Sequence, residues 1–130
     1  MPTRSFLNAK IHGARITAAS PEYEGSLSID PVLMRAVGIL PYERIDVYNI
    51  DNGERLTTYA IHGAPGEIGL NGAAARKGEL GQRVIVATYC WLDAAEMSGH
   101  KARVVIVDTN NQPVRSITCE VPGPDGDCAG

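Results

Sequence analysis

Several residue types and patterns that mark particular classes of protein are scarce in this 130-residue chain. Its three cysteines, Cys90, Cys119 and Cys128, form no close pair, which indicates reduced thiols rather than a disulfide framework. They and the three histidines lack the ligand spacing of a zinc site, so we expect no metal. A formal net charge of −3 provides no basic surface for DNA or RNA, so we expect no nucleic-acid partner.

Long apolar segments are also missing. No segment approaches the roughly 20 apolar residues of a membrane-spanning helix, and the first residues carry no apolar run of signal-peptide length. We therefore expect a cytoplasmic protein without a membrane partner. The chain contains 44% hydrophobic and 21% charged residues, which is typical of one globular domain with a single core. We expect this domain over residues 1–118, followed by a tail over 119–130 that is predicted to be disordered.

Short apolar runs separated by glycine and proline predict many short strands and few helices. Strands are expected near residues 5–16, 25–29, 45–50, 55–61, 83–91, 102–107 and, at a sheet edge, 113–118. One helix is well signalled, because Asp30 can cap it, Pro31 suits its first position and Gly38 can end it. Asn71-Gly72 predicts a tight turn before a short helical run of alanines. This pattern favours a small β-barrel.

The dipeptide Gly25-Ser26 offers unusual chemistry. The Ser26 hydroxyl can attack the Gly25 carbonyl, which moves the acyl group from nitrogen to oxygen. Elimination of the ester leaves a dehydroalanine, which hydrolyses to a pyruvoyl group at the start of residues 26–130. Such a dipeptide also occurs by chance in many chains of this length, so its meaning depends on the motifs around it.

Those motifs occur in a specific order and spacing. They are Lys10-Ile11-His12, Gly25-Ser26-Leu27-Ser28-Ile29-Asp30, Gly38-Ile39-Leu40, Ile45-Asp46-Val47-Tyr48-Asn49, Asn52-Gly53, Arg55-Leu56-Thr57-Thr58-Tyr59-Ala60-Ile61 and Leu70-Asn71-Gly72-Ala73-Ala74-Ala75. With them the chain closely resembles the pyruvoyl-dependent aspartate 1-decarboxylases over about residues 3 to 118. Tyr48 departs from the common pattern, since a tryptophan often stands there.

The resemblance implies a fold, an activity and a cofactor. The fold is mainly β, a six-stranded double-psi β-barrel with a few short helices, assembled as a homotetramer with active sites between subunits. The activity is decarboxylation of L-aspartate to β-alanine and CO₂ for pantothenate and coenzyme A biosynthesis. The cofactor is the pyruvoyl group made by self-cleavage between Gly25 and Ser26, which forms a Schiff base with the substrate amine. It takes the place of pyridoxal phosphate, for which the chain has no evident motif.

An aspartate-sized substrate brings two carboxylates and therefore needs cations. Arg55 offers a planar fork for one carboxylate and Lys10 supplies a second charge. The resemblance implies that both hold the substrate, without indicating which carboxylate each one binds. Tyr59, on the Arg55 face of its strand, is the candidate proton donor, because a phenol with a pKa of about 10 can protonate a basic carbanion.

The remaining candidate residues rest mainly on the resemblance. It implies that Thr58 and Tyr23 assist self-cleavage, although strand alternation places Thr58 on the face opposite Arg55 and Tyr59. His12, on the Lys10 face, can orient a carboxylate. Substrate and pyruvoyl contacts are expected from the segment Asn71, Gly72, Ala73 and Ala74, and from Thr58.

Two other functions stay open at this point. The cations suit any small acidic amino acid, because one methylene changes binding by only about 1–3 kcal/mol. A non-enzymatic barrel used as a binding module is the other alternative. A serine hydrolase is disfavoured, since Ser26 lacks the Gly-x-Ser-x-Gly elbow. The sequence leaves open whether a maturation protein assists cleavage.

Overall fold

The computed structural model describes residues 2–121 and is mainly β, which confirms the expected fold class. Short helices join some of the strands. In chain order the elements are β1 (Arg4–Arg15), β2 (Ala18–Ser20), β3 (Ser26–Ile29), α1 (Pro31–Val37), β4 (Arg44–Asn49), β5 (Arg55–His62), β6 (Ile68–Asn71), the 3₁₀ helix η1 (Gly72–Lys77), β7 (Arg83–Leu92), α2 (Ala94–Met97), β8 (Lys101–Val107) and β9 (Pro113–Glu120). Among the described residues, no helix combines the length and apolarity that crossing a membrane requires.

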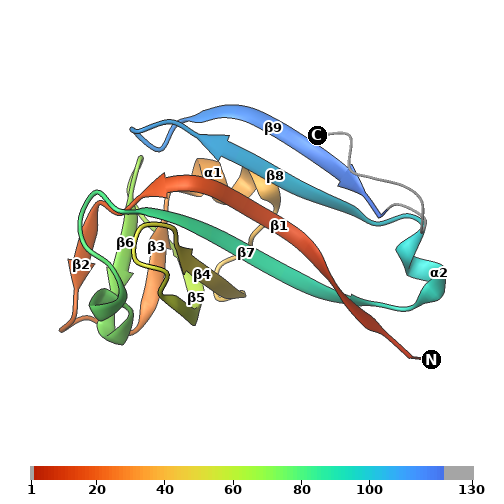
Figure 1. The fold of residues 1–130 in the computed structure, drawn as a ribbon, viewed down its shortest axis with the longest axis horizontal. Coiled ribbons are helices and arrows are strands. Elements are labelled where there is room, and N and C mark those ends of the chain that lie inside the picture. Colours follow the sequence, from red (N-terminus) through yellow and green to blue (C-terminus); the bar gives the residue numbers. More distant parts are fainter. Residues whose placement is uncertain (1, 122–130) are drawn as a thin grey trace.

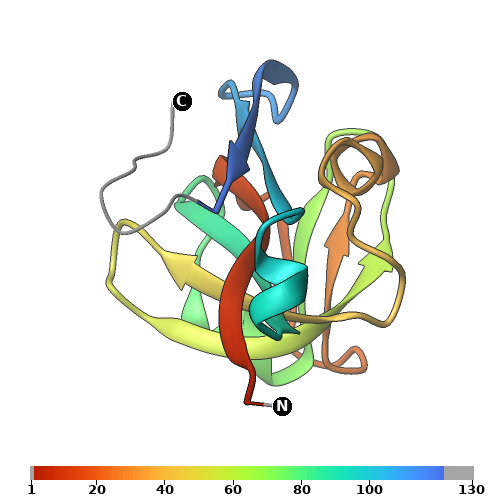
Figure 2. The same ribbon diagram turned by 90° about the vertical axis from the view of Figure 1, so that its right-hand side faces the viewer.

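The strands pair in the order β2-β6-β3-β5-β4-β7-β1-β8-β9. The pairs β1/β8, β2/β6 and β3/β5 are parallel, and the other pairs are antiparallel. The short strands β2, β3 and β6 lie together at one end of the long strands β1 and β7 (Figure 1), and the strands curve around a common interior (Figure 2). In residues 2–121 this order has two ends, β2 and β9, so closure into a six-stranded double-psi barrel stays a prediction.

Two strands were not predicted from the sequence. β2 has only three residues, and β6 contains a glycine, which weakens the strand signal. Every residue of β6 is nevertheless buried, because it pairs with β2 on one side and β3 on the other. β6 matters for function because its last residue is Asn71.

The end of the described chain differs in two ways from what we expected. β9 continues to Glu120, two residues past the expected domain end, while residues 122–130 of the predicted tail lie outside the described part. Cys119 in β9 is disulfide-bonded, whereas Cys90 is a free thiol. The expectation of reduced thiols is therefore wrong for Cys119, because spacing along a chain does not determine which thiols approach in space.

Helix α1 forms as its capping residues predict. The Asp30 carboxylate accepts hydrogen bonds from the backbone N–H groups of Val32 and Gly66, both at 2.8 Å. Gly38 ends the helix in the left-handed region, with φ of 77°. Asp30 therefore stabilises both the start of α1 and the loop before β6, and this fixes the end of β3.

The core is formed by aliphatic side chains from most strands and from α1. Its largest fully buried members are Ile11, Ile16, Leu27, Ile29, Leu33, Met34, Val37, Ile45, Val47, Ile68, Leu70 and Val84. All four residues of β3 are buried, including Ser26 and Ser28. The β3 segment that carries the proposed cleavage site is thus part of the core rather than a mobile loop.

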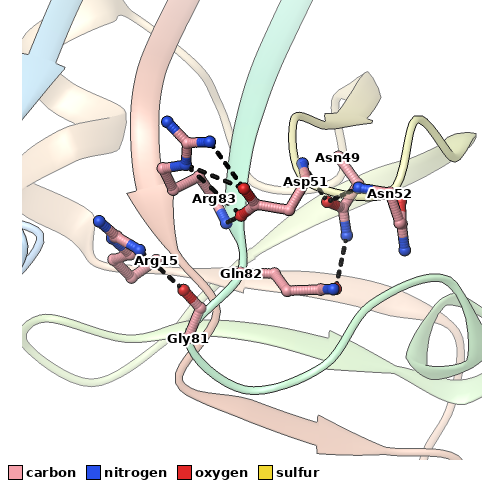
Figure 3. Close-up of polar contacts among 7 residues, drawn as sticks. All are labelled: Arg15, Asn49, Asp51, Asn52, Gly81, Gln82 and Arg83. Atoms are coloured by element: carbon pink, nitrogen blue, oxygen red, sulfur yellow. Dashed lines mark hydrogen bonds and ion pairs between the residues drawn. The ribbon is translucent and has the colours of Figure 1, made fainter.

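Polar contacts tie the turn after β4 to the segment between η1 and β7 (Figure 3). Asn49 Nδ2 donates to Gln82 Oε1 at 3.0 Å and to the Lys77 carbonyl at 3.2 Å. The Asp51 carboxylate accepts from the Arg83 guanidinium at 2.7 Å. These bonds hold η1 near the β4–β5 hairpin, which places Ala73 and Ala74 beside β5.

Candidate active site

Ser26 is the first residue of β3, and its side chain is only 2% exposed, whereas the preceding Gly25 is exposed. Asn71 Nδ2 donates a hydrogen bond to Ser26 Oγ at 3.0 Å. Ser26 Oγ itself donates to the Glu24 carbonyl in a long contact of 3.5 Å. The Gly25–Ser26 peptide bond therefore lies at the boundary between surface and core, and the Ser26 hydroxyl is on the buried side.

The segment before the proposed cleavage site packs closely on Gly72. This glycine has φ of +65°, and a Cβ there would lie 2.7 Å from Gly25 N and Cα and 2.9 Å from the Tyr23 carbonyl oxygen. A side chain at position 72 would therefore collide with backbone atoms. The predicted turn glycine thus also provides the surface on which the Tyr23–Gly25 segment lies.

A cavity of about 300 Å³ adjoins Gly25. It is lined by Gly25, Leu56, Thr57, Thr58, Ala73, Ala74 and Lys77. Thr58 pairs with the buried Ile45, so it lies on the face opposite Tyr59, as alternation predicts. It still reaches the cavity that Gly25 lines. Lys77 was not predicted as a site residue; it lies in the 3₁₀ helix η1 and forms a 2.9 Å ion pair with Glu54.

Tyr59 lies beside the start of β3. Strands β3 and β5 are parallel, and Leu27 pairs with Ala60. Ser26 and Tyr59, which immediately precede this pair, therefore occupy corresponding positions on the two neighbouring strands. The Tyr59 ring is half-buried, and its centre lies 6.0 Å from that of Tyr42.

The predicted cations lie on one face of the sheet formed by β1, β7, β4 and β5. Across these strands, His12 aligns with Ile85, Tyr48 and Arg55, while Lys10 aligns with Ala87, Asp46 and Thr57. Lys10 lines a cavity of about 240 Å³ and Arg55 one of about 410 Å³. Tyr48 borders both cavities. Within one chain, the cavity beside Gly25 is lined by neither Lys10 nor Arg55, although the Arg55 cavity shares Leu56 and Thr57 with it.

The electrostatics of this face affect two titrating groups. Partial burial, followed by the charges of Lys10 and Arg83, lowers the pKa of His12 below its ordinary value. Both effects favour the neutral form of the His12 imidazole. The hydrogen bond with Tyr89, together with burial, raises the pKa of Tyr48 to about 12. Among the described residues, no cluster of three or more His, Cys, Asp or Glu side chains could hold a metal ion.

Comparison with known proteins identifies the chain. A model of the family described as "Aspartate decarboxylase" matches residues 2–114. The chain belongs to the aspartate decarboxylase family. It is 52% identical over 113 residues to an aspartate 1-decarboxylase from Syntrophobacter fumaroxidans, with 85% of this chain and 91% of the relative covered. Proteins of the same name from Psychromonas ingrahamii and Acaryochloris marina are 49% and 51% identical over 115 and 114 residues. These matches cover 87% and 85% of this chain, and 91% and 86% of the relatives.

In this aspartate decarboxylase, most of the predicted site residues form two groups, while Tyr59 lies beside Ser26 and Tyr23 lies near Gly72. Gly25, Thr58, Ala73 and Ala74 share one cavity, which Gly72, Asn71 and Ser26 adjoin. Lys10, His12 and Arg55 share the outer sheet face. Tyr48 and Tyr89 were missed as members of the second group, and the only sequence signal for Tyr48 was its place where a tryptophan is common.

Proposed function

We propose that this enzyme decarboxylates L-aspartate to β-alanine and CO₂ through a pyruvoyl group that it makes by cutting itself between Gly25 and Ser26. Membership of the aspartate decarboxylase family supports the reaction. One observation carries the self-cleavage: a buried serine hydroxyl, held by Asn71 at 3.0 Å, directly follows a glycine that lines a cavity together with Thr58. β-Alanine production for pantothenate and coenzyme A synthesis, in the cytoplasm, follows as the metabolic role.

Self-cleavage uses only groups of the chain and water. Ser26 Oγ forms a bond to the Gly25 carbonyl carbon, the peptide C–N bond breaks, and the hydroxyl proton passes to the freed nitrogen. Loss of the Ser26 α-proton then breaks the Cβ–Oγ bond, which leaves a carboxylate on Gly25. Water converts the resulting dehydroalanine to the ketone, with release of ammonia. Thr58 lines the same cavity as Gly25, and in this proposal its hydroxyl donates to the Gly25 carbonyl during cleavage. Gly72 packs against the backbone of Tyr23 and Gly25 and keeps this segment in place.

The residues around Ser26 suit a pyruvoyl group. The position is buried, and the cavity of about 300 Å³ beside Gly25 has room for a small substrate. The ketone, once formed, supplies the sink for the electrons that remain when CO₂ departs. Asn71 and the backbone N–H groups near Gly72, Ala73 and Ala74 are donors for oxygen atoms of the substrate and ketone.

The second group of residues binds the substrate, and Tyr59 protonates it. Arg55 binds one carboxylate through its fork, Lys10 supplies the second charge, and neutral His12 orients a carboxylate by a hydrogen bond. Tyr59 delivers a proton to the α-carbon after CO₂ is lost. Lys10 does not line the cavity beside Gly25 in its own chain, which favours a homotetramer whose active sites combine residues of two subunits.

Intact-mass measurement of the purified protein tests the self-cleavage. We expect fragments of residues 1–25 and 26–130, with a keto-acyl group at the start of the larger one. Ser26→Ala should stay uncut and inactive, while Ser98→Ala, at an exposed position, should behave as the parent. Active protein that consists of a single uncut chain would contradict the mechanism. Cleavage that occurs only after addition of cell extract would indicate a maturation factor.

A decarboxylase of another acidic amino acid is the competing function, because the same cations would bind it. Steady-state rates with aspartate, glutamate and substituted aspartates distinguish the two. We expect kcat/KM to be highest for L-aspartate, and a higher value for another substrate would replace this assignment. A binding module without activity is disfavoured by membership of an enzyme family.

A further inference from the structure

The side-chain amide of Asn71 contacts two buried hydroxyl groups. Its Nδ2 donates to Ser26 Oγ at 3.0 Å and to Ser28 Oγ at 2.9 Å. Ser26 is 2% exposed, and Ser28 and Asn71 are each 7% exposed. The two serines alternate along β3 and therefore present their hydroxyls on the same face, where Asn71 pairs with Ser26 across the β3/β6 ladder.

Self-cleavage removes one of these two hydroxyls. The proposed elimination breaks the Cβ–Oγ bond of Ser26 and leaves that oxygen in the carboxylate of Gly25. Asn71 thereby loses its contact with the Ser26 hydroxyl in the elimination, before water converts the dehydroalanine to the ketone. The hydrogen bond to Ser28 involves no reacting atom and remains. Because Asn71 Nδ2 faces both serines, the group that loses its partner is an N–H donor.

We propose that Ser28 is a positioning residue that holds the Asn71 amide in place after cleavage, so that its freed N–H points to the oxygen of the new ketone or of the substrate. The inference rests on the proposed function, since it requires that Ser26 loses its oxygen. Ser28 touches neither the substrate nor the ketone and acts only through Asn71. A fixed amide needs no reorientation during turnover, which is the advantage of such preorganisation.

The surroundings of Ser28 leave its side chain little freedom. Its partner on β6 is Gly69, and a Cβ built on Gly69 would lie 3.4 Å from the Ser28 Cβ. A Cβ on Gly63 would lie 3.2 Å from the same atom. Two glycines therefore provide the space that the serine side chain occupies, and the hydroxyl is directed to Asn71.

The test measures turnover in completely cut protein. Ser28→Ala removes the hydroxyl, and we expect kcat/KM to fall about three- to tenfold, the usual effect of one lost buried hydrogen bond. Thr88→Val is the matched control, because Thr88 Oγ1 is buried and has no hydrogen-bond partner among the described residues. This control should keep the parent rate. Equal kcat/KM for Ser28→Ala and the parent would overturn the inference.

A second pair of variants separates the hydroxyl from the packing. Ser28→Thr and Ser28→Val have the same shape, so any crowding against Gly63 and Gly69 affects both alike, and only the first keeps the hydroxyl. We expect the threonine variant to be at least threefold more active than the valine variant, and equal rates would contradict the role of Ser28. A Ser28→Ala chain that stays uncut while Thr88→Val is cut would place the role of Ser28 in cleavage instead, which also overturns the inference. If the parent itself contains no keto-acyl terminus, the proposed function fails, whatever Ser28 does.

Discussion

The guanidinium of Arg55 lies over the ring of Tyr48, with its Cζ 4.7 Å from the ring centre. Tyr48 in turn shares a hydrogen bond of 3.0 Å with the hydroxyl of Tyr89. A planar cation that rests on an aromatic face keeps its edge free for a carboxylate. The orientation of the proposed substrate-binding arginine thus depends on two tyrosines that lie on different strands.

Replacing Arg55 by lysine tests this arrangement. The charge is retained, but the planar fork and its stacking on Tyr48 are lost. We expect kcat/KM for aspartate to fall about tenfold, or ~1.4 kcal/mol, mainly through a higher KM because ground-state binding is weakened. Arg35→Lys, on the exposed side of α1, is the control. A parent-like KM for Arg55→Lys would exclude bidentate binding by this residue.

Replacing Tyr89 by phenylalanine tests the hydrogen bond between the hydroxyls of Tyr48 and Tyr89. The hydrogen bond with Tyr89 is the largest cause that raises the pKa of Tyr48 to about 12. Without it, Tyr48 should ionise at a lower pH, closer to the ordinary value of about 10. An NMR titration of ring-labelled tyrosine measures this shift, with Tyr42→Phe as the control because Tyr42 is exposed and lies outside the pair. An unchanged Tyr48 titration would show that the hydroxyl contact is unimportant.

Replacing Gly72 by alanine tests the packing of the segment that precedes the proposed cleavage site. The added Cβ would lie 2.7 Å from backbone atoms of Gly25, so the segment must move and cleavage should slow strongly. Gly53→Ala is a matched control, because Gly53 also has positive φ, at +76°, but nothing lies within 4 Å of an added Cβ. Both variants should lose about 1–2 kcal/mol of stability from the left-handed backbone.

Only Gly72→Ala should accumulate uncut chain, as measured by intact mass over time. Equal cleavage in the two glycine variants would show that contact with Gly25 does not influence the reaction.

The pH dependence of stability tests the environment of His12. Its lowered pKa means that the unfolded state binds this proton more tightly, so the folded state loses stability as the pH falls below the unfolded value of about 6.5. His12→Gln removes this loss, so the melting temperature should drop less than in the parent between about pH 7.5 and about pH 5. A drop as large as that of the parent would mean that His12 is no source of acid destabilisation.

Local signals in the sequence predicted much of this protein correctly. Asp30, Pro31 and Gly38 predicted α1 because capping depends on residues adjacent in the chain. Alternation of side chains correctly separated Thr58 from Tyr59 and Arg55. The family motifs around Gly25-Ser26 led to the family that comparison with known proteins shows. All of these features involve residues that are close in sequence.

Contacts between residues that are far apart in the chain could not be predicted from such local signals. Strands β2 and β6 are short and lack alternation. They could therefore be recognised only from the strands with which they pair. The stacking of Arg55 on Tyr48 and the hydrogen bond between Tyr48 and Tyr89 were likewise not predicted, because position 89 is 34 residues from position 55 in the chain.

The amino-acid sequence by itself determined the candidate dipeptide Gly25-Ser26, the capped helix and the family, since each depends on residue identity and short spacing. Only the tertiary structure decided that Asn71 meets both Ser26 and Ser28, that Gly72 contacts Gly25, and that Lys10 lies apart from the cavity beside Gly25. The physical reason is that strand pairing joins segments tens of residues apart, and its register follows from burial of the whole core rather than from any local pattern.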